Sequence, residues 1–464
     1  MSHPTRPTSA PRERVFLCGV RGVEEDAGID EDLSEASGLV AAAEADVVGE
    51  GVLQRKLRPD PATLFGKGKV EEVQSEVRRL HPVAVIVDND LTPAQIRNLE
   101  KSWGVRVVDR SELILDIFAR RAQSRQARLQ VELAQNEYLA PRLRRMWTHL
   151  ERTEGAIGTR GPGETQLETD KRLLRRRIQV LKEELREIEA RKLREVETRS
   201  ENFTIGLVGY TNTGKSTLLN RLTGSTEFVA DQLFATLDTR TRQWRLPDGR
   251  TVLLSDTVGF LRRLPHHLVA SFHATLEETL AADLLLHVID ASHPRADVQI
   301  AAVDKVIGEL SRRARAAILV FNKVDQVEDR LGIQLLRHGR REEVVYVSAT
   351  TGEGIDRLEE AVARRLDEQS FLVDAYVPLA DGRLNACLGR LGRPLEDEIS
   401  MEREERRIRL RLTRAALGNL RRTGGGALRI DLVAPPSRPG SVNPSRETSF
   451  SDGEFGPGNL AAGT

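Results

Sequence analysis

The sequence is poor in the features that mark secreted, metal-clustered or membrane-spanning proteins. Its 464 residues include two cysteines, Cys18 and Cys387, too far apart along the chain to suggest a disulfide framework or a metal cluster. No apolar run approaches the roughly 20 residues that a membrane-spanning helix needs. The leader at 1–12 is polar, is expected to be disordered, and is not followed by the apolar segment of a signal peptide. We therefore expect a cytoplasmic protein without a membrane span.

The chain also lacks a net charge, because 70 Lys and Arg residues balance 70 Asp and Glu residues. Whole-protein charge therefore gives no reason to expect a polyanionic partner, although basic residues can still cluster locally. A chain of 464 residues is too long for one ordinary core. Its length suggests roughly three domains.

Residues 13–110 alternate between strand-like and helix-like stretches. Strands are expected at 15–20, 47–53, 83–87 and 105–108, and helices at 33–45, at 69–80 and after Thr92-Pro93, where a cap precedes a first-turn proline. This alternation predicts a small α/β domain with a mainly parallel sheet. The segment Gly66-Lys67-Gly68-Lys69 lacks the full spacing of a phosphate loop and is interpreted as a turn before a helix.

Residues 111–200 predict two long helices with a break between them. The first, at 111–139, contains no Gly or Pro and repeats apolar residues at helical spacing. The second, at about 165–196, is dense in alternating Arg and Glu. Two such helices make a helical hairpin, a geometry found in antiparallel coiled coils.

The break between these helices concentrates glycine at 155–165, the expected tip. Arginines flank it, with one aromatic residue nearby: Arg142, Arg144, Arg145, Arg152, Arg160 and Trp147. The residues alone leave two interpretations open. A basic helix pair can be only a solvated charged face. A glycine-rich tip with clustered arginines also suits structured RNA, where guanidinium groups pair with phosphates and stack on bases.

The central feature of the chain is a phosphate-binding loop. An apolar run at 203–208 leads into Gly209-Tyr210-Thr211-Asn212-Thr213-Gly214-Lys215-Ser216, and a helix-like run follows from Thr217. Glycines let backbone N–H groups close around an anion, the helix N-terminus adds partial positive charge, and Lys215 supplies a cation for the phosphates. The hydroxyl of Ser216 is expected to hold a metal ion.

Strands and helices alternate again around this loop, over residues 201–368. Strands are expected at 205–208, 251–254, 284–289, 317–321 and 344–347. The pattern predicts a doubly wound sheet that binds its ligand at the carboxyl ends of the strands. Each further motif comes directly after one of these strands.

Three motifs turn the phosphate loop into a guanine nucleotide site. Asp256-Thr257-Val258-Gly259 offers a carboxylate to the magnesium shell and a glycine N–H to a γ-phosphate. Asn322-Lys323-Val324-Asp325 selects guanine, because the Asp325 carboxylate can accept from the ring N–H and the exocyclic amine, a donor pair that adenine lacks. Ser348-Ala349-Thr350 adds backbone contact to the guanine carbonyl. Their order, each after its own strand, favours a GTPase over a generic ATPase.

A switch segment is expected between the phosphate loop and Asp256, at Phe234-Ala235-Thr236-Leu237-Asp238. Thr236 is the candidate that completes magnesium coordination when a γ-phosphate is present, with Thr239 and Thr241 as rivals. The expected metal ligands are Ser216, Thr236 and Asp256, and the expected catalytic residues are Lys215, Thr236 and Gly259.

One part of a typical GTPase is missing. The position after Gly259, where many GTPases carry a glutamine that orients the attacking water, is Phe260. An apolar side chain cannot polarise water. Hydrolysis should therefore be slow unaided and should depend on a group from elsewhere.

The C-terminal part is less informative. Residues 369–434 combine extended runs at 375–379, 407–411 and 428–433 with a helical stretch at 383–391, which predicts a small α+β domain. The tail at 435–464 is rich in Pro, Ser, Gly and Asn and is expected to be disordered.

Together these residues resemble the HflX family of translational GTPases. Three stretches carry the resemblance: GTRGPGETQLE from Gly158 to Glu168 at the hairpin, DTVGFLRRLPH from Asp256 to His266 continuing to Leu276-Glu277-Glu278, and LQVELAQ from Leu129 to Gln135 on the first long helix. The likeness spans about Val15 to Val433. The hairpin stretch is much more specific than any of the nucleotide motifs.

The resemblance implies a GTPase that binds GTP or GDP with Mg²⁺ and docks on the large ribosomal subunit through its N-terminal domain and helical hairpin. The tip would reach ribosomal RNA near the peptidyl transferase centre, with Arg144, Arg145 and Arg160 in the contact region. The family is tied to splitting or rescuing stalled ribosomes under stress. It commonly carries an apolar residue in place of the glutamine, so Phe260 conforms to it, while Lys67 is a mild departure.

We therefore predict an α/β protein: a P-loop GTPase with a doubly wound sheet, preceded by a small α/β domain with a long helical hairpin and followed by a small α+β domain. A monomer is expected. Two other functions stay open at this point. One is a non-catalytic RNA-binding or assembly factor that uses nucleotide as a structural ligand. The other is a GTPase that acts on transfer RNA or on a signalling protein.

Overall fold

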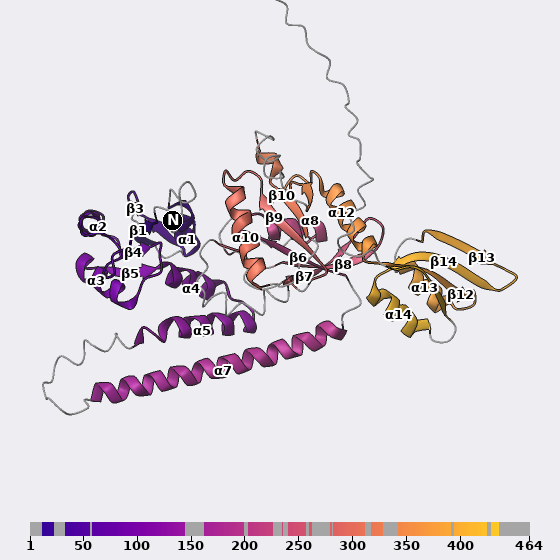
Figure 1. Ribbon diagram of the computed structural model, residues 1–464, viewed down its shortest axis with the longest axis horizontal. Helices are drawn as coiled ribbons and strands as arrows, with labels where there is room; N and C mark the ends of the chain where they lie inside the picture. The colour runs from indigo at the N-terminus through magenta and orange to yellow at the C-terminus, as the bar shows by residue number, and fades with distance from the viewer. Residues whose placement is uncertain are drawn as a thin grey trace, which may run out of the picture.

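The computed structural model describes residues 12–22, 33–55, 58–143, 162–198, 203–225, 234, 240–256, 259–261, 279–280, 282–310, 317–327, 342–390, 394–424 and 428–435. They form three sheets with their helices, arranged in a row along the longest axis of the molecule (Figure 1). The expected disordered leader and tail and most of the hairpin tip lie outside the described residues.

The N-terminal sheet is built around β1 (Glu13–Arg21), which pairs in parallel with β2 (Ala45–Val47), β3 (Val52–Arg55) and β4 (Ala84–Val87). Strand β5 (Arg106–Asp109) adds to β4, also in parallel. Helices α1 (Ser34–Ala42) and α4 (Arg110–Arg121) cover one face, and α2 (Lys67–Leu80) and α3 (Pro93–Trp103) cover the other. Both faces are thus buried, which explains the continuous apolar runs in these strands.

The expected helix at 111–139 is two helices. Helix α4 ends at Arg121, and α5 (Arg125–Leu139) begins after Ser124, whose hydroxyl accepts from the Ala127 N–H at 3.1 Å. No Gly or Pro marks this break, so a periodicity argument misses it. Helix α4 has its C-cap at Ala122, and Ser124 then caps the first turn of the new helix α5.

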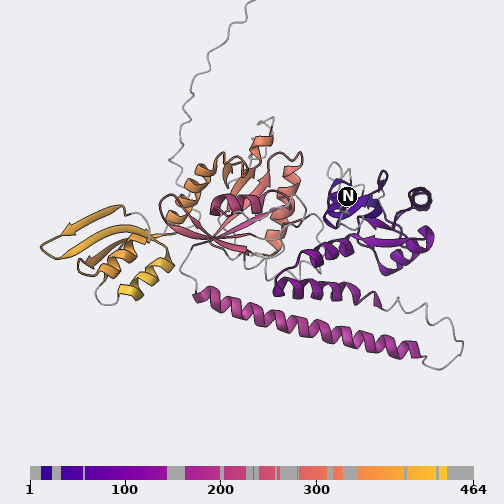
Figure 2. The ribbon, with the colours of Figure 1, turned by 180° about the vertical axis from the view of Figure 1, so that it is seen from behind.

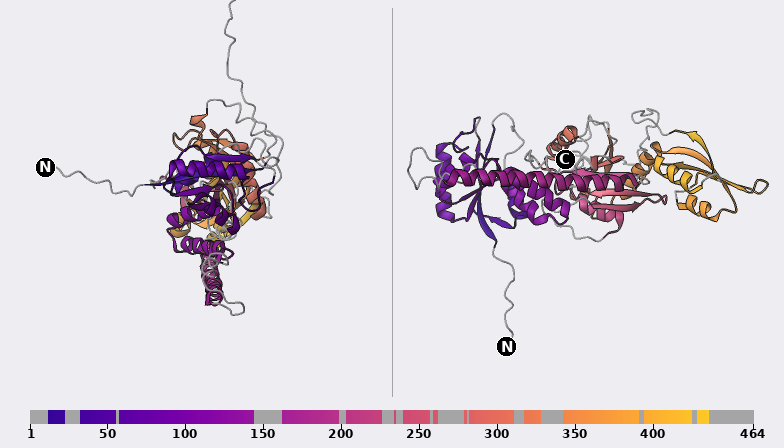
Figure 3. Two further views of the ribbon diagram at one scale, coloured as in Figure 1. Left: turned by 90° about the vertical axis from the view of Figure 1, so that its left-hand side faces the viewer. Right: turned by 90° about the horizontal axis from the view of Figure 1, so that it is seen from below.

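Helix α7 (Pro162–Thr198) runs antiparallel to α5 (Figure 1). At 37 residues it is about 55 Å long. An apolar seam and flanking ion pairs join the two helices: Leu129, Leu133, Leu181 and Leu185 form the seam, and Arg177 pairs with Glu132 and Arg125 with Glu184. Seen from below, α7 extends along the underside of both the N-terminal and the central sheets (Figure 3).

The central sheet has the strand order β11-β10-β9-β6-β8-β7. Its strands are β6 (Thr204–Gly209), β7 (Arg240–Arg245), β8 (Thr251–Asp256), β9 (Leu284–Asp290), β10 (Ala317–Asn322) and β11 (Glu343–Tyr346). All pair in parallel except β7, which pairs antiparallel with β8 at the edge. Because β6 lies between β8 and β9, the chain order reverses at β6, where open α/β sheets bind their ligands.

Helices cover both faces of the central sheet. Helices α8 (Lys215–Thr223) and α12 (Ile355–Glu368) pack on one face, and α10 (Ala296–Leu310) packs on the other. A short 3₁₀ helix, η3 (Val324–Gln326), follows β10. These elements form the doubly wound sheet that the sequence predicts.

The C-terminal sheet is antiparallel, in the order β13-β14-β12-β15. It comprises β12 (Phe371–Pro378), β13 (Glu396–Ser400), β14 (Glu405–Leu412) and β15 (Arg429–Ala434), with α13 (Gly382–Arg390) and α14 (Arg414–Gly424) packed on one face. The sequence predicts α13 but misses β13 and α14. The order of an α/β domain, a doubly wound domain and an α+β domain confirms the predicted fold class.

The C-terminal sheet lies at the end of the molecule away from the N-terminal sheet (Figure 2). The N-terminal and central domains share one apolar cluster, to which α4 and the loop after β6 both contribute. Within the described part of the chain, no helix is both long and apolar enough to cross a membrane.

Candidate functional site

The loop between β6 and α8 depends on two glycines. A Cβ at Gly209 would lie 2.3 Å from the carbonyl oxygen of Val288, and a Cβ at Gly214 would lie 2.4 Å from the Asn322 side chain. Gly214 also has a φ of +86°, which side chains disfavour. Larger residues would therefore displace the strand and the side chain that the loop touches.

Lys215 begins α8 and is buried in the loop. Its ammonium donates to the carbonyl oxygens of Gly209 at 3.1 Å and Tyr210 at 2.6 Å. Burial lowers the pKa of Lys215 to about 8, against the opposing effect of the Asp256 carboxylate. A buried ammonium at a helix N-terminus suits a polyanion, whose negative charge would offset its desolvation.

Ser216 and Asp256 lie side by side. The Ser216 hydroxyl donates to Asp256 Oδ2 at 2.6 Å, and Asp256 is fully buried at the end of β8. A hydroxyl and a carboxylate are the oxygen ligands that Mg²⁺ accepts, with phosphate oxygens and water completing its shell. Among the described residues, no group of three or more His, Cys, Asp or Glu side chains could hold a metal ion. The hydroxyl of Ser216 and the carboxylate of Asp256 offer two oxygens to a metal that is bound jointly with phosphates.

Gly259 approaches the phosphate loop closely. A Cβ there would lie 2.7 Å from Thr211 Cα and 3.0 Å from the Lys215 ammonium. The next residue, Phe260, pairs its backbone with the loop, since its N–H donates to Gly209 and its carbonyl accepts from Thr211. Its side chain is buried in the apolar cluster shared with the N-terminal domain. Thr257 and Val258 lie outside the described residues.

Asn322, the last residue of β10, bonds to two loops. Its Nδ2 donates to the Thr213 carbonyl at 2.8 Å, and its Oδ1 accepts from the Ala349 N–H at 3.0 Å. The side chain is 2% exposed. The amide thus ties the phosphate loop to the loop after β11, so that the motifs predicted for phosphate and for guanine are held together.

The next residues of this motif range from the buried Val324 to the exposed Asp325. Lys323 has a φ of +62°, and its ammonium pairs with Asp290 Oδ2 at 2.6 Å. Asp290 ends β9 and was not expected from the sequence, because only the fold brings β9 and β10 together. Val324 and Asp325 begin η3, where Asp325 is exposed, as a residue that receives a base edge must be.

Ser348-Ala349-Thr350 forms a tight loop after β11. The Ser348 carbonyl accepts from Gly352, and its hydroxyl accepts from the Thr351 N–H at 3.1 Å. Ser348 and Ala349 are buried, and the hydrogen bond from the Ala349 N–H to Asn322 fixes the position of this loop.

The switch segment is described at one position. Phe234 donates its N–H to the Thr211 hydroxyl at 3.1 Å, so it lies against the phosphate loop. Ala235, Thr236, Leu237, Asp238 and Thr239 lie outside the described residues. The rival Thr241 is in β7, where its hydroxyl bonds to that of Ser255 at 2.9 Å.

Most of the hairpin tip and the arginines assigned to it, Arg144, Arg145 and Arg160, also lie outside the described residues. Close by, α7 presents a basic face around a shallow hollow, lined by Lys171, Arg172, Arg175 and Arg176 with Glu168 and Gln179. The sequence did not predict this face, because the clustered arginines and glycines favoured the tip.

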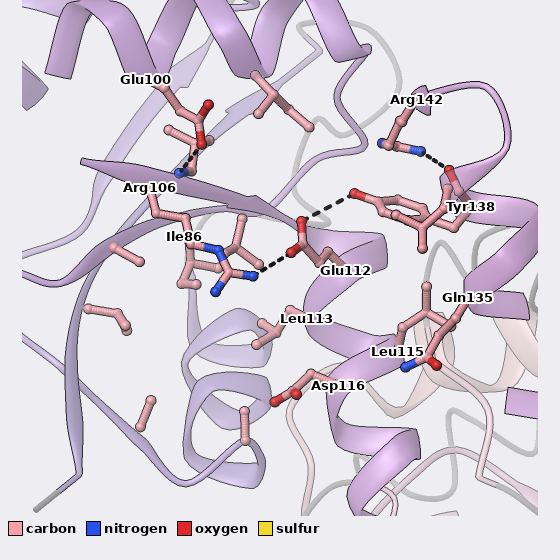
Figure 4. A pocket seen from close by; sticks show the side chains of 18 of the residues that line it. Ile86, Glu100, Arg106, Glu112, Leu113, Leu115, Asp116, Gln135, Tyr138 and Arg142 are labelled. Carbon is pink, nitrogen blue, oxygen red and sulfur yellow. Dashed lines mark hydrogen bonds and ion pairs between the residues drawn. The ribbon is translucent and has the colours of Figure 1, made fainter. Parts of the chain in front are cut away.

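Arg142 differs from its expected place among the arginines that flank the tip. Its guanidinium donates to Asp109 Oδ2 at 2.9 Å and to the Leu91 carbonyl at 3.0 Å, and it lies 3.4 Å from the centre of the Tyr138 ring. Figure 4 shows it above Tyr138 at the edge of a pocket between α4, α5 and the sheet. Arg142 therefore anchors the C-terminal end of α5, where the chain leaves toward the tip, to the N-terminal domain.

Three family models match the N-terminal domain, the hairpin and the central domain as far as residue 323. Residues 30–119 match the family described as GTP-binding GTPase N-terminal, and residues 121–199 match the GTP-binding GTPase middle region. Residues 204–323 match the family described as 50S ribosome-binding GTPase.

Curated relatives resemble most of the chain. A protein named GTPase HflX from Caldanaerobacter subterraneus is 44% identical over 83% of this chain and 88% of its own length. The GTPase HflX of Escherichia coli K12 is 45% identical over 77% of this chain and 84% of its own. That of Magnetococcus marinus is 47% identical over 70% and 75%.

Proposed function

This chain belongs to the HflX family of GTPases, and from this premise we propose that it is a GTP-driven switch that acts on the large ribosomal subunit. It binds GTP and hydrolyses it to GDP and phosphate. We further propose that it splits or rescues stalled ribosomes under stress and that it acts in the cytoplasm.

The proposed phosphate site is the loop from Gly209 to Ser216 with the first turn of α8. The backbone N–H groups and the Lys215 ammonium bind the phosphates, and Gly259 gives the γ-phosphate room to approach. Ser216, Asp256 and Thr236 would hold Mg²⁺, which neutralises charge on the phosphate oxygens when bound. The contact between Ser216 and Asp256 at 2.6 Å supports two of these three assignments.

The observation that carries the guanine assignment is the position of Asn322. By bonding to both Thr213 and Ala349 it holds the phosphate loop and the loop after β11 at a fixed separation. Asp325 then offers its carboxylate to the ring N–H and the exocyclic amine of guanine, while the backbone near Ala349 meets the guanine carbonyl. Preorganised loops reduce the ordering cost of binding.

Hydrolysis is proposed to be slow until a partner contributes. The Phe260 side chain is buried at 1% exposure among apolar residues, so it presents no polar group to a water molecule. The group that orients water must therefore come from a residue outside this position. The ribosome is the partner we propose for that stimulation.

The ribosome assignment is supported by the match of residues 204–323 to a family described as 50S ribosome-binding GTPase and by the basic face of α7. Arginines on a rigid helix suit the phosphates of folded RNA, where guanidinium groups bind in a fork. The hairpin carries this face away from the nucleotide site. Arg142 holds the tip-side end of α5 against the N-terminal domain, so the direction of the hairpin depends on that domain.

A sedimentation assay with purified large ribosomal subunits tests this proposal. The double variant Arg172→Glu/Arg176→Glu reverses two exposed charges on α7, whereas the matched control Arg78→Glu/Arg357→Glu reverses two exposed charges on α2 and α12. We expect the α7 variant to lose affinity on the order of tenfold or more, and to show a shallower salt dependence. The control should bind like the wild type.

Equal binding by both variants would place the RNA contact elsewhere. Equal loss in both would show that binding follows overall charge and would contradict a specific hairpin interface. Affinity for GDP, measured in parallel, should be the same in all three proteins, because α7 lies away from the phosphate loop.

A further inference from the structure

The phosphate loop is bonded directly to the N-terminal domain. The hydroxyl of Tyr210, the second residue of the loop, donates to Glu35 in the first turn of α1. The other carboxylate oxygen of Glu35 accepts from Arg110, which also donates to Asp88. Arg21 donates to the same Asp88 carboxylate. The tyrosine hydroxyl is therefore the end of a chain of alternating charges that begins inside another domain.

This chain of charges is fixed in place. The side chains of Arg21, Asp88 and Arg110 are each 5% exposed or less, and that of Glu35 is 24% exposed. They lie at the carboxyl ends of β1, β4 and β5, where an open parallel sheet commonly binds its ligand. Glu35 and Tyr210 occupy the carboxyl-end edge of this sheet. Buried, mutually bonded charges resist displacement because any break leaves a desolvated partner.

A second contact joins the same two domains. The rings of Phe118 on α4 and Phe234 in the switch segment meet edge to face, with centroids 4.6 Å apart. Phe234 has a φ of +57°, an uncommon conformation for a large side chain, and such conformations persist when their surroundings hold them. Its N–H donates to Thr211, the residue after Tyr210. The two contacts therefore hold adjacent residues of the loop.

Tyr210 is also central on the nucleotide side. Its carbonyl accepts the Lys215 ammonium at 2.6 Å, and its backbone pairs with Phe260. A shift of Tyr210 would move the carbonyl oxygen that holds the Lys215 ammonium, the cation proposed to bind phosphate. It would also move Phe260, the residue that follows Gly259. The position of Glu35 is thus transmitted to the phosphate loop through one residue.

We propose that Glu35 is a positioning residue of the nucleotide site, which acts through the Tyr210 hydroxyl to hold the phosphate loop in its binding shape and so slows nucleotide release. The inference rests on the nucleotide site proposed above and is independent of the ribosomal partner. It makes the N-terminal domain a part of the GTPase site. By reciprocity, bound nucleotide would strengthen the contact between the two domains.

The test measures the dissociation rate of a fluorescent GDP derivative from the full chain. Tyr210→Phe removes only the hydroxyl that donates the hydrogen bond. Glu35→Gln removes the negative charge of the acceptor, and the double variant removes both. Each single variant should release the nucleotide faster, on the order of tenfold for loss of a charge-assisted hydrogen bond. The double variant should be no faster than the faster single, because both changes break one bond.

Tyr376→Phe is the matched control, since it removes a hydroxyl from the C-terminal sheet, where the ring lies beneath Arg429. It should release nucleotide at the wild-type rate. A purely structural role for Glu35 predicts a lower thermal midpoint with an unchanged release rate, and that result would overturn the inference. Additive effects of the two changes would also overturn it. Failure of the wild type to bind GDP would overturn the proposed nucleotide site as well.

Discussion

Replacing Asn322 with alanine should release the phosphate loop from the loop after β11. The side chain makes two hydrogen bonds, of 2.8 Å and 3.0 Å, to backbone groups of Thr213 and Ala349. Stranding a buried donor or acceptor costs about 1–3 kcal/mol. Loss of both bonds should therefore cost about 2–6 kcal/mol, shared between the stability of the central domain and its affinity for nucleotide.

The matched control is Gln95→Ala. Gln95 is also buried, and it also donates one bond, to the Asp60 carbonyl at 3.3 Å, and accepts one, from the Thr92 N–H at 2.8 Å. It lies in the capping box of α3, within the N-terminal domain. Its loss should lower the thermal midpoint without touching the nucleotide site.

Thermal unfolding and GDP titration of both variants separate a loss of nucleotide affinity from general destabilisation. Both should unfold at lower temperature, but only Asn322→Ala should raise the Kd for GDP, on the order of tenfold or more, which corresponds to about 1.4 kcal/mol. A Kd unchanged in Asn322→Ala would show that the two loops keep their separation without this side chain. An equal rise in Gln95→Ala would show that general destabilisation accounts for the effect.

Three further predictions concern individual groups. Asp325→Asn replaces one carboxylate acceptor with a donor, so it should weaken GTP and improve xanthosine triphosphate in competition binding; unchanged GTP affinity would refute its assignment to the base. Burial lowers the pKa of Lys215 to about 8, and bound phosphates favour its ammonium form. GTP affinity should therefore fall about tenfold from pH 7 to pH 9, with proton uptake on binding at pH 9. Calorimetry in two buffers of different ionisation heat measures this uptake, and proton release would contradict the prediction. Joint replacement of Arg144, Arg145 and Arg160 by alanine should abolish binding to large ribosomal subunits and leave GDP affinity intact; retained binding would favour a protein partner for the hairpin.

The strands of the central domain were predictable because most of them are buried. Strands such as β9 and β10 carry continuous apolar residues and end in polar motifs, which locates both the strand and the site. Strand β7 was missed for the opposite reason. It lies at the edge of the sheet, reads RTRQWR, and buries only Trp244, so its composition resembles a loop.

The helix at 111–139 shows a limit of periodicity. Its apolar residues serve two different partners, since Leu113 and Ile117 face the N-terminal sheet whereas Leu129 and Leu133 face α7. A repeat at helical spacing continues through the bend and does not reveal the change of partner. The signal that could have shown the break is Ser124, a residue that caps helices well.

The contacts between distant residues could not be read from the sequence. The charges of Glu35 and Arg110 appear as ordinary surface charges, and Arg142 appears as one more arginine near a basic tip. Each bonds a residue far along the chain: Tyr210 lies 175 positions from Glu35, and Asp109 lies 33 positions from Arg142. Only the packing of domains on one another gives these residues their roles.

A ribosome-stimulated switch is tested most directly by the rate of GTP hydrolysis of the full chain, measured at one salt concentration with and without purified large ribosomal subunits. A switch that carries Phe260 and acts on the ribosome should turn over slowly alone and should be stimulated when subunits are added. Rapid turnover by the isolated chain, or a rate that subunits leave unchanged, would contradict the account.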